Sequence, residues 1–232
     1  MNGAILLAGG MGSRLQSEIP KQYVRVAGKL LATYSLETLC RHPGIDTVLV
    51  VAEYKWRECI EKNLKKYVVT NKLCGFADPG LNRQLSILNA LNEIKYNWNA
   101  AMDNILIHDA ARPNLSEKQI TECLRVLEEH DGVMPTLPMK DTVYLCEGTS
   151  VSSLLDRSKV FVGQAPEAYK FDKYYEANRR LQPSDLSMIN GSTEPAIMAE
   201  LDVVTIPGDE HNYKITTPQD LKRFIVEKEQ RL

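Results

Sequence analysis

The sequence predicts an α/β fold in which a mostly parallel sheet is covered by helices on both faces, with an additional protruding β-arm. Short, nearly continuous apolar segments alternate with helical patterns along the first half of the chain, and that alternation predicts strand–helix–strand units. The segments expected to form strands are residues 3–8, 46–52, 72–77 and 104–108. Apolar runs without polar alternation are typical of strands that are buried on both faces.

Helical patterns fill the intervals between these strands, at residues 31–41, 54–66 and 85–94. After the last strand, Ser116 and Gln119 have the spacing of a capping box, and apolar residues then recur at helical intervals. Near the C-terminus, Thr217 is placed to cap a helix that begins at Pro218.

The middle of the chain has a different pattern. Residues 139–155 alternate Thr, Val and Tyr with polar residues around a Glu147-Gly148 pair, which predicts a β-hairpin or arm. We expect one domain spanning residues 1–232, with the arm at about 139–158.

Composition excludes several classes of function. The 28 Lys and Arg residues are balanced by 30 Asp and Glu residues, so no basic excess indicates nucleic-acid binding. No apolar run approaches the roughly 20 residues that a membrane-spanning helix needs, and no cationic segment precedes the first strand. Five scattered cysteines without a CxxC pair favour reduced, mostly core-filling thiols, and we expect a cytoplasmic protein.

A glycine-rich segment follows the first predicted strand. Gly9, Gly10 and Gly12 allow backbone N–H groups to approach phosphate oxygens, and Arg14 and Lys21 supply positive charge. The segment lacks the G-K-[ST] ending of a Walker loop. It also lacks the G-x-G-x-x-G pattern of a dinucleotide site, because position 15 is Leu, which disfavours an NAD-dependent oxidoreductase.

Several motifs together resemble one enzyme family. They are Leu6-Leu7-Ala8-Gly9-Gly10-x-Gly12-x-Arg14, Pro20-Lys21-Gln22, His108-Asp109-Ala110-Ala111-Arg112-Pro113, Met139-Lys140-Asp141-Thr142, Asp156-Arg157, Gly163-Gln164-Ala165-Pro166 and residues 212–221. In this order they resemble the family of methylerythritol-phosphate and ribitol-5-phosphate cytidylyltransferases. The resemblance implies a Rossmann-like, nucleotidyltransferase type A-like fold, CTP as a substrate, Mg²⁺ as the divalent cation, and a homodimer formed through the arm.

The resemblance also implies roles for individual residues. Those expected to act on the reacting phosphates are Arg14, Lys21, Arg157 (from the partner subunit's arm) and Lys214. Those expected to bind CTP are Leu7, Ala8, Gly9, Gly10, Gly12, Gly80, Arg83, Ser86, Asp109 and Ala110, with Asp109 also expected to bind the metal. Those expected to bind the acceptor are Arg112, Lys140, Asp141, Thr142, Thr193 and Glu194.

Some of these residues have alternative roles. Asp109 ends a strand where ligands collect in open α/β sheets, but its side chain can instead cap the local turn. Arg112 is expected either to contact substrate or to pair with a nearby carboxylate. Residues 82–83 can simply begin a helix, and Lys140 can begin a solvated strand. His108 is expected to be packed or hydrogen-bonded locally, because attack by a phosphate needs no general base.

Two segments depart from the family pattern. Asn190-Gly191-Ser192-Thr193-Glu194 replaces a motif whose aspartate contacts acceptor hydroxyls, with Gly191 at the place of that aspartate. Ala165 and Glu167 stand where Thr and Gln are customary. Family members specialised for methylerythritol phosphate usually begin with P-A-A-G, whereas Leu7-Ala8-Gly9-Gly10 is closer to the polyol-phosphate members. The resemblance therefore implies a cytidylyltransferase that converts a small polyol phosphate, such as ribitol 5-phosphate, to a CDP-alditol. The alternatives are 2-C-methyl-D-erythritol 4-phosphate as acceptor and a nucleotide-binding protein without catalysis.

Overall fold

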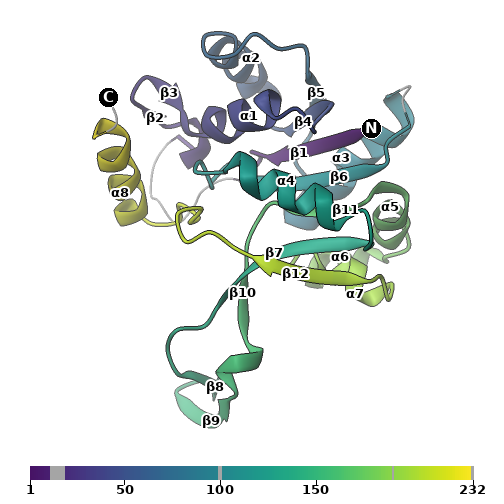
Figure 1. Cartoon of the computed structure of the whole chain (residues 1–232), viewed down its shortest axis with the longest axis vertical. Coiled ribbons are helices and arrows are strands. Elements are labelled where there is room, and N and C mark those ends of the chain that lie inside the picture. The colour runs from purple at the N-terminus through teal and green to yellow at the C-terminus, as the bar shows by residue number, and fades with distance from the viewer. Residues whose placement is uncertain (11–18, 99–100, 190, 231–232) are drawn as a thin grey trace.

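The computed structural model describes residues 1–10, 19–98, 101–189 and 191–230. Its centre is an eight-stranded mixed sheet (Figure 1). The parallel half of this sheet contains β5 (Leu73–Ala77), β4 (Thr47–Val51), β1 (Asn2–Leu7) and β6 (Asn104–Asp109), in that spatial order. All four strands lie where the apolar segments predict them.

The other half of the sheet contains antiparallel pairs. It consists of β11 (Glu167–Lys170), β7 (Gly132–Pro138), β10 (Phe161–Gly163) and β12 (Val203–Pro207). β11 lies antiparallel between β6 and β7, and β10 pairs antiparallel with β7, whereas β12 pairs parallel with β7. The sheet is therefore parallel from β5 to β6 and mixed beyond β6.

Helices cover both faces of the sheet. One face is packed by α1 (Leu31–Arg41), α2 (Tyr54–Leu64) and α4 (Glu117–Val126). The opposite face is packed by α3 (Arg83–Asn97), α5 (Phe171–Arg179) and α7 (Glu194–Met198). Successive strand residues alternate between these two cores, as Val50 and Val51 do, so both faces of the strand are buried. The predicted fold class is confirmed.

The remaining short elements surround this core. They are β2 (Arg25–Val26) and β3 (Lys29–Leu30), the 3₁₀ helices η2 (Lys21–Tyr23) and η3 (Arg157–Lys159), α6 (Pro183–Met188) and α8 (Pro218–Glu229). Among the helices of the described residues, none combines the length and apolarity that crossing a membrane requires.

Helix caps follow the sequence signals with two differences. Thr217 and Asp220 form a complete capping box at the start of α8. At α4 only half of the box is present: the Ser116 hydroxyl accepts from the Gln119 backbone N–H, whereas the Gln119 side chain donates to the Pro207 carbonyl. The helix predicted from residue 85 starts earlier, at Arg83, because the Asn82 side chain caps it.

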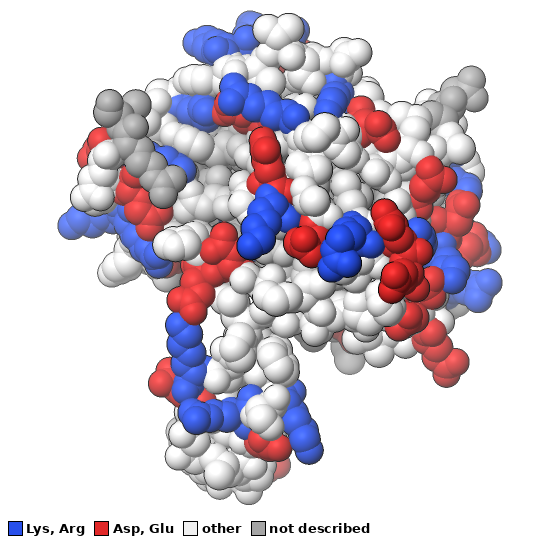
Figure 2. All heavy atoms as spheres, viewed as in Figure 1, with Lys and Arg blue, Asp and Glu red and all other residues white. Residues whose placement is uncertain are grey.

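The predicted hairpin is present as β8 (Val143–Glu147) and β9 (Ser150–Leu155). Gly148 has a φ of +61°, a value that favours glycine at this turn. The hairpin projects away from the sheet as an arm (Figure 1). Its end carries extensive uncharged surface (Figure 2), and Tyr144, Leu145, Val151 and Leu154 are exposed there.

Candidate active site

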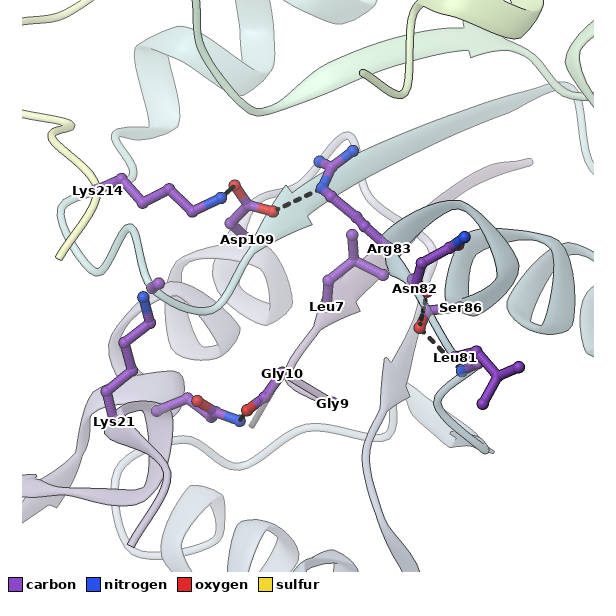
Figure 3. Close-up of a pocket in the computed structure, with 13 residues that line it drawn as sticks. Leu7, Gly9, Gly10, Lys21, Leu81, Asn82, Arg83, Ser86, Asp109 and Lys214 are labelled. Atoms are coloured by element: carbon purple, nitrogen blue, oxygen red, sulfur yellow. Dashed lines mark hydrogen bonds and ion pairs between the residues drawn. The ribbon is translucent and has the colours of Figure 1, made fainter. Parts of the chain in front are cut away.

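A cavity of about 380 Å³ lies at the carboxyl ends of β1 and β6 (Figure 3). After β1 the chain continues to β4 on one side of the sheet, whereas after β6 it continues to β7 on the other side. In open α/β folds, ligands bind at the point where the strand order switches in this way. The cavity is lined by Leu7, Gly9, Gly10, Lys21, Gln22, Gly80, Leu81, Asn82, Arg83, Ser86, Asp109, Ala111 and Lys214. The structure thus brings together residues from five distant parts of the chain.

Two glycines allow the loops around this cavity to pack closely. A Cβ on Gly9 would lie 2.4 Å from Cβ of Pro79, and one on Gly80 would lie 2.4 Å from Cβ of Leu85. Gly10 differs, because a Cβ there would meet no atom within 4 Å. Its small size is therefore not needed for packing against the described residues, and it leaves open space beside the cavity.

The start of the glycine-rich loop is held by the segment that carries Lys21. The Gln22 side-chain amide donates to the Ala8 carbonyl at 2.6 Å and to the Gly10 carbonyl at 2.7 Å. The Tyr23 hydroxyl donates to the same Ala8 carbonyl at 2.7 Å. These bonds fix Lys21 at the cavity wall. Gly12 and Arg14 lie outside the described residues.

The loop before α3 is organised by Ser86 and Asn82. The Ser86 hydroxyl accepts from the Gly80 N–H and donates to the Asn82 carbonyl, both at 2.9 Å. The Asn82 side chain accepts from the Leu85 N–H at 2.8 Å and donates to the Leu186 carbonyl at 2.8 Å. Ser86 therefore shapes this wall of the cavity, and residues 82–83 are indeed a helix start.

Asp109 is the centre of the charged groups. Lys214 and Arg83 approach its carboxylate from opposite sides (Figure 3), with Nζ of Lys214 at 2.8 Å and Nε of Arg83 at 3.2 Å. Nε of Arg112 lies 3.8 Å away. Burial by itself would raise the pKa of Asp109, but these three cations outweigh it and hold the pKa far below its usual range. Asp109 is therefore ionised at neutral pH.

Arg112 and Asn212 fix the position of the Lys214 backbone. Nη1 of Arg112 donates to the Asn212 carbonyl at 2.7 Å, and the Asn212 side chain donates to the Ala165 carbonyl at 2.7 Å. The Ile215 N–H donates to the Ala111 carbonyl at 2.8 Å. Of the two roles expected for Arg112, the structure shows the pair with a local carboxylate.

A second cavity of about 510 Å³ adjoins the first and shares Arg83, Asp109 and Lys214 with it. Its other lining residues are Arg112, Met134, Gly163, Gln164, Ala165, Glu167, Gly191, Ser192, Thr193, Glu194 and Ile197. Of the predicted acceptor residues it contains Arg112, Thr193 and Glu194. The Thr193 hydroxyl is hydrogen-bonded to the Tyr169 hydroxyl at 2.9 Å, which draws it toward the core.

Some predicted residues lie away from both cavities. Ala8 and Ala110 are buried, and their N–H groups donate to the Val51 and Leu7 carbonyls within the sheet. Lys140, Asp141 and Thr142 are exposed at the base of the arm, where Lys140 pairs with Glu210 at 2.5 Å. Nη1 of Arg157 donates to the Lys140 carbonyl at 3.0 Å, so within its own chain Arg157 stays with the arm.

His108 is fully buried and hydrogen-bonded locally, as the sequence predicts. Its Nε2 lies 2.9 Å from the Arg112 carbonyl oxygen. Burial lowers the pKa of His108 to about 4, so the ring is neutral at physiological pH and supports the Arg112 turn.

Sequence reasoning missed several cavity residues. Gln22 belongs to the Pro20-Lys21-Gln22 motif, but the motif predicts no role for it, because its bonds to the loop carbonyls depend on the folded path. In the sequence, Glu167 and Ser192 are only departures from the family pattern. They lie 25 positions apart in the sequence and meet through a hydrogen bond. The sequence contains one indication of this site: Glu167 is an acidic residue at the start of a segment whose other residues are typical of a buried strand.

Asp109 is the only acidic side chain among the described residues that line the first cavity. Among the described residues no three His, Cys, Asp or Glu side chains are grouped to hold a metal. Mg²⁺ is commonly bound through one or two carboxylates together with substrate phosphates and water. A single ionised carboxylate beside an open cavity fits that arrangement, with most ligands coming from a triphosphate.

Comparison with known proteins shows which family the chain resembles. The family model described as 2-C-methyl-D-erythritol 4-phosphate cytidylyltransferase matches residues 3–228. The chain is 31% identical to the protein of that name from Clostridium acetobutylicum, over 95% of this chain and 94% of the relative. It is 29% identical to a ribitol-5-phosphate cytidylyltransferase from Lacticaseibacillus paracasei, over 97% of this chain and 98% of the relative.

The fold has close structural counterparts. The crystal structure of 2-C-methyl-D-erythritol 4-phosphate cytidylyltransferase from Francisella tularensis superposes with a TM-score of 0.79, at 23% identity, covering 96% of this chain and 97% of that one. The matches extend over nearly the whole chain and include both loops of the first cavity. The chain therefore belongs to the 2-C-methyl-D-erythritol 4-phosphate cytidylyltransferase family of nucleotidyltransferases.

Proposed function

We propose that the protein transfers a cytidylyl group from CTP to 2-C-methyl-D-erythritol 4-phosphate and releases pyrophosphate. The main support for this proposal is that the two cavities adjoin: Arg83, Asp109 and Lys214 line both of them. CTP would occupy the cavity beside the glycine loop, and the acceptor would occupy the other. We propose 2-C-methyl-D-erythritol 4-phosphate in place of ribitol 5-phosphate, because the family model and most of the similar relatives are described as 2-C-methyl-D-erythritol 4-phosphate cytidylyltransferases.

The proposed chemistry is an in-line displacement. An oxygen of the acceptor phosphate forms a bond to the α-phosphorus of CTP, and the bond from that phosphorus to the bridging oxygen of the β-phosphate breaks. The electron pair leaves with pyrophosphate. A phosphate monoester is largely dianionic at neutral pH, so no proton has to be removed from the nucleophile. Lys21 and Lys214 would offset the negative charge that gathers at the reacting phosphorus. Arg14 is proposed to assist them.

Mg²⁺ is proposed to enter with the nucleotide and contact Asp109. When bound it would supply positive charge to the triphosphate and orient it. Removing divalent cations with EDTA should abolish turnover, and adding excess Mg²⁺ should restore it. Full activity in EDTA would exclude this role, and measurement of pyrophosphate release decides between the two outcomes.

We further propose that residues 1–232 form one cytoplasmic nucleotidyltransferase domain that dimerises through the arm. Two features support the dimer. The arm exposes apolar side chains that a monomer would leave in water, including Leu145 and Leu154. Arg157 stays away from both cavities of its own chain, so it would act only in a partner's site.

The test is a panel of acceptors assayed with CTP and Mg²⁺. The panel contains 2-C-methyl-D-erythritol 4-phosphate, ribitol 5-phosphate and glycerol 3-phosphate, and release of pyrophosphate is measured. We expect the highest kcat/KM with the first. Preference for ribitol 5-phosphate would favour the second candidate function, which the relative from Lacticaseibacillus paracasei supports. No turnover of any acceptor would contradict both. Lys21→Ala is the inactive control.

A further inference from the structure

Glu167 is a buried carboxylate for which the proposed phosphate chemistry has no use. It is the first residue of β11, opposite Ile107 of β6, and only 9% of it is exposed. It nevertheless lines the second cavity. Acidic side chains are rarely buried unless they are paired or bind a ligand, so we expect Glu167 to have a cation or a hydrogen-bond donor as its partner.

The chain itself supplies part of that partnership. Oε2 of Glu167 accepts a hydrogen bond from the Ser192 hydroxyl and lies 3.6 Å from Nη2 of Arg83. Arg83 is shared, because its Nε also pairs with Asp109 at 3.2 Å. Burial raises the pKa of Glu167 despite the opposing effects of Arg83 and Ser192, so the carboxylate is not fully compensated. A further hydrogen-bond donor in the cavity would stabilise it.

This cavity contains both cationic and acidic side chains. Arg83 and Lys214 line the part that it shares with the nucleotide cavity, and Arg112 lies beside Asp109 there. Glu167 and Glu194 line it outside the shared part, with Glu167 3.6 Å from Arg83. A phosphate is attracted to the first group and repelled by the second. An acceptor that presents its phosphate to the nucleotide must therefore place an uncharged part against Glu167, and hydroxyl groups are uncharged donors that a carboxylate can accept.

We infer that Glu167, which stands where Gln is customary in the family, is a specificity-determining residue that accepts hydrogen bonds from hydroxyl groups of the acceptor. This inference rests on the proposed function. Ser192 orients the carboxylate, and the Tyr174 hydroxyl, which donates to the Ser192 carbonyl at 2.6 Å, holds that segment in place. An acceptor with a methylene in place of the recognised hydroxyl leaves a buried carboxylate without its donor and is rejected.

The test compares the wild type with Glu167→Gln on an intact acceptor and on analogues that each lack one hydroxyl. The acceptor is the best of the panel above, CTP and Mg²⁺ are saturating, and kcat/KM is obtained from pyrophosphate release. Glu167→Gln keeps the size of the side chain and an acceptor for Ser192 but removes the charge. We expect kcat/KM on the intact acceptor to fall about 10- to 100-fold, with KM for CTP changed less than about twofold.

The decisive result is non-additivity. One analogue should lose about as much with the wild type as the variant loses on the intact acceptor, and on that analogue the two enzymes should be nearly equal. If the losses multiply for every analogue, Glu167 only supports the fold and the inference is overturned. Absence of turnover by the wild type on all acceptors would overturn the proposed function itself.

Two further variants serve as controls for this test. Glu58→Gln makes the same chemical change on the exposed face of α2, where Glu58 pairs with Lys62, and its kinetics should match the wild type. Ser192→Ala removes the hydroxyl that donates to Glu167 but leaves the carboxylate. Its kinetics can therefore test the inference even if Glu167→Gln folds poorly. The penalty for the critical missing hydroxyl should persist in Ser192→Ala, and its disappearance would count against Glu167.

Discussion

At the scale of single residues, the site depends on charges that the protein holds out of water. Asp109 is buried among Arg83, Arg112 and Lys214, and this pairing keeps it ionised. Lys214 remains 37% exposed, so it faces the cavity while it is anchored to Asp109. A preorganised cation of this kind stabilises developing negative charge without having to reorganise during the reaction.

Replacing Lys214 by Ala should reduce kcat by about 10²- to 10³-fold, because one stabilising charge at the reacting phosphates is lost. Steady-state assays of pyrophosphate release measure the effect. Lys62→Ala is the matched control, since Lys62 lies on the exposed face of α2 and pairs only with Glu58 among the described salt bridges. A fall of less than threefold in Lys214→Ala would contradict the assignment.

His108 predicts a dependence of stability on pH. Its pKa is about 4 in the folded chain, against 6.5 for an unperturbed ring, so between these values the unfolded chain binds a proton that the folded chain does not. The free energy of unfolding should therefore fall as the pH is lowered from 6.5 to 4, by about 3 kcal/mol in total from this residue. Above pH 6.5 its contribution is constant.

Comparison with His108→Phe isolates this contribution. The variant loses the hydrogen bond to the Arg112 carbonyl, so it should be less stable at pH 7, and the difference from the wild type should shrink as the pH approaches 4. Urea unfolding, followed without CTP and in the presence of EDTA, gives both curves. Parallel curves for the two proteins would show that His108 does not titrate in this way.

At the scale of elements, the cavity is shaped by two turns that follow strands. The turn after β1 is held by Gln22, and the turn after β5 is held by Ser86 and Asn82 at the start of α3. Gly9 and Gly80 allow these turns to approach their neighbours. Each turn therefore depends on a packing contact as well as on its own backbone preference.

Gly80→Ala tests the second turn. The added Cβ would lie 2.4 Å from Cβ of Leu85 and 2.8 Å from the Ser86 nitrogen, so the turn must move. We expect a loss of about 1–3 kcal/mol in the free energy of unfolding and a raised KM for CTP. Gly75→Ala is the control, because its Cβ would meet no atom within 4 Å, and it should change neither quantity appreciably. Equal effects from the two variants would refute the packing explanation.

At the scale of the whole molecule, the site of one chain is proposed to be completed by the arm of another. Arg157 is held on the arm beside Lys140 and lines neither cavity of its own chain. The arm projects away from the sheet (Figure 1). A twofold dimer would place each arm against the partner, because a closed interface uses the same surface on both copies.

Subunit mixing tests this arrangement. Arg157→Ala and Lys214→Ala should each be nearly inactive alone. In a mixed dimer one site lacks both residues and the other has both, so random mixing should restore about a quarter of wild-type activity. Unfolding and refolding the two variants together, followed by an assay of pyrophosphate release, measures the recovery. No recovery, despite exchange verified with tagged subunits, would contradict an Arg157 supplied by the partner.

The sequence by itself determined the fold class, the positions of the four parallel strands and of the arm, and the glycine-rich loop after the first strand. These features depend on local patterns: apolar runs such as residues 104–108, the cap at Thr217, and the turn at Gly148. Local patterns report which face of a segment is buried and where the chain turns. They also carried the resemblance through which Lys21, Asp109 and Lys214 were identified as candidates, and all three line the first cavity.

Only the tertiary structure decided which of these side chains meet. It separated Ala8, Ala110 and Lys140 from the cavities, turned Arg112 toward Asp109 and Asn212, and brought Glu167 to Ser192. Most of these contacts join residues tens of positions apart, as Arg112 with Asn212 and Glu167 with Ser192, and they depend on strand register and loop path, which no short pattern encodes. In the sequence, Glu167 is only a departure from the family pattern. In the fold its carboxylate lines the second cavity, and this placement supports the role that we infer for it.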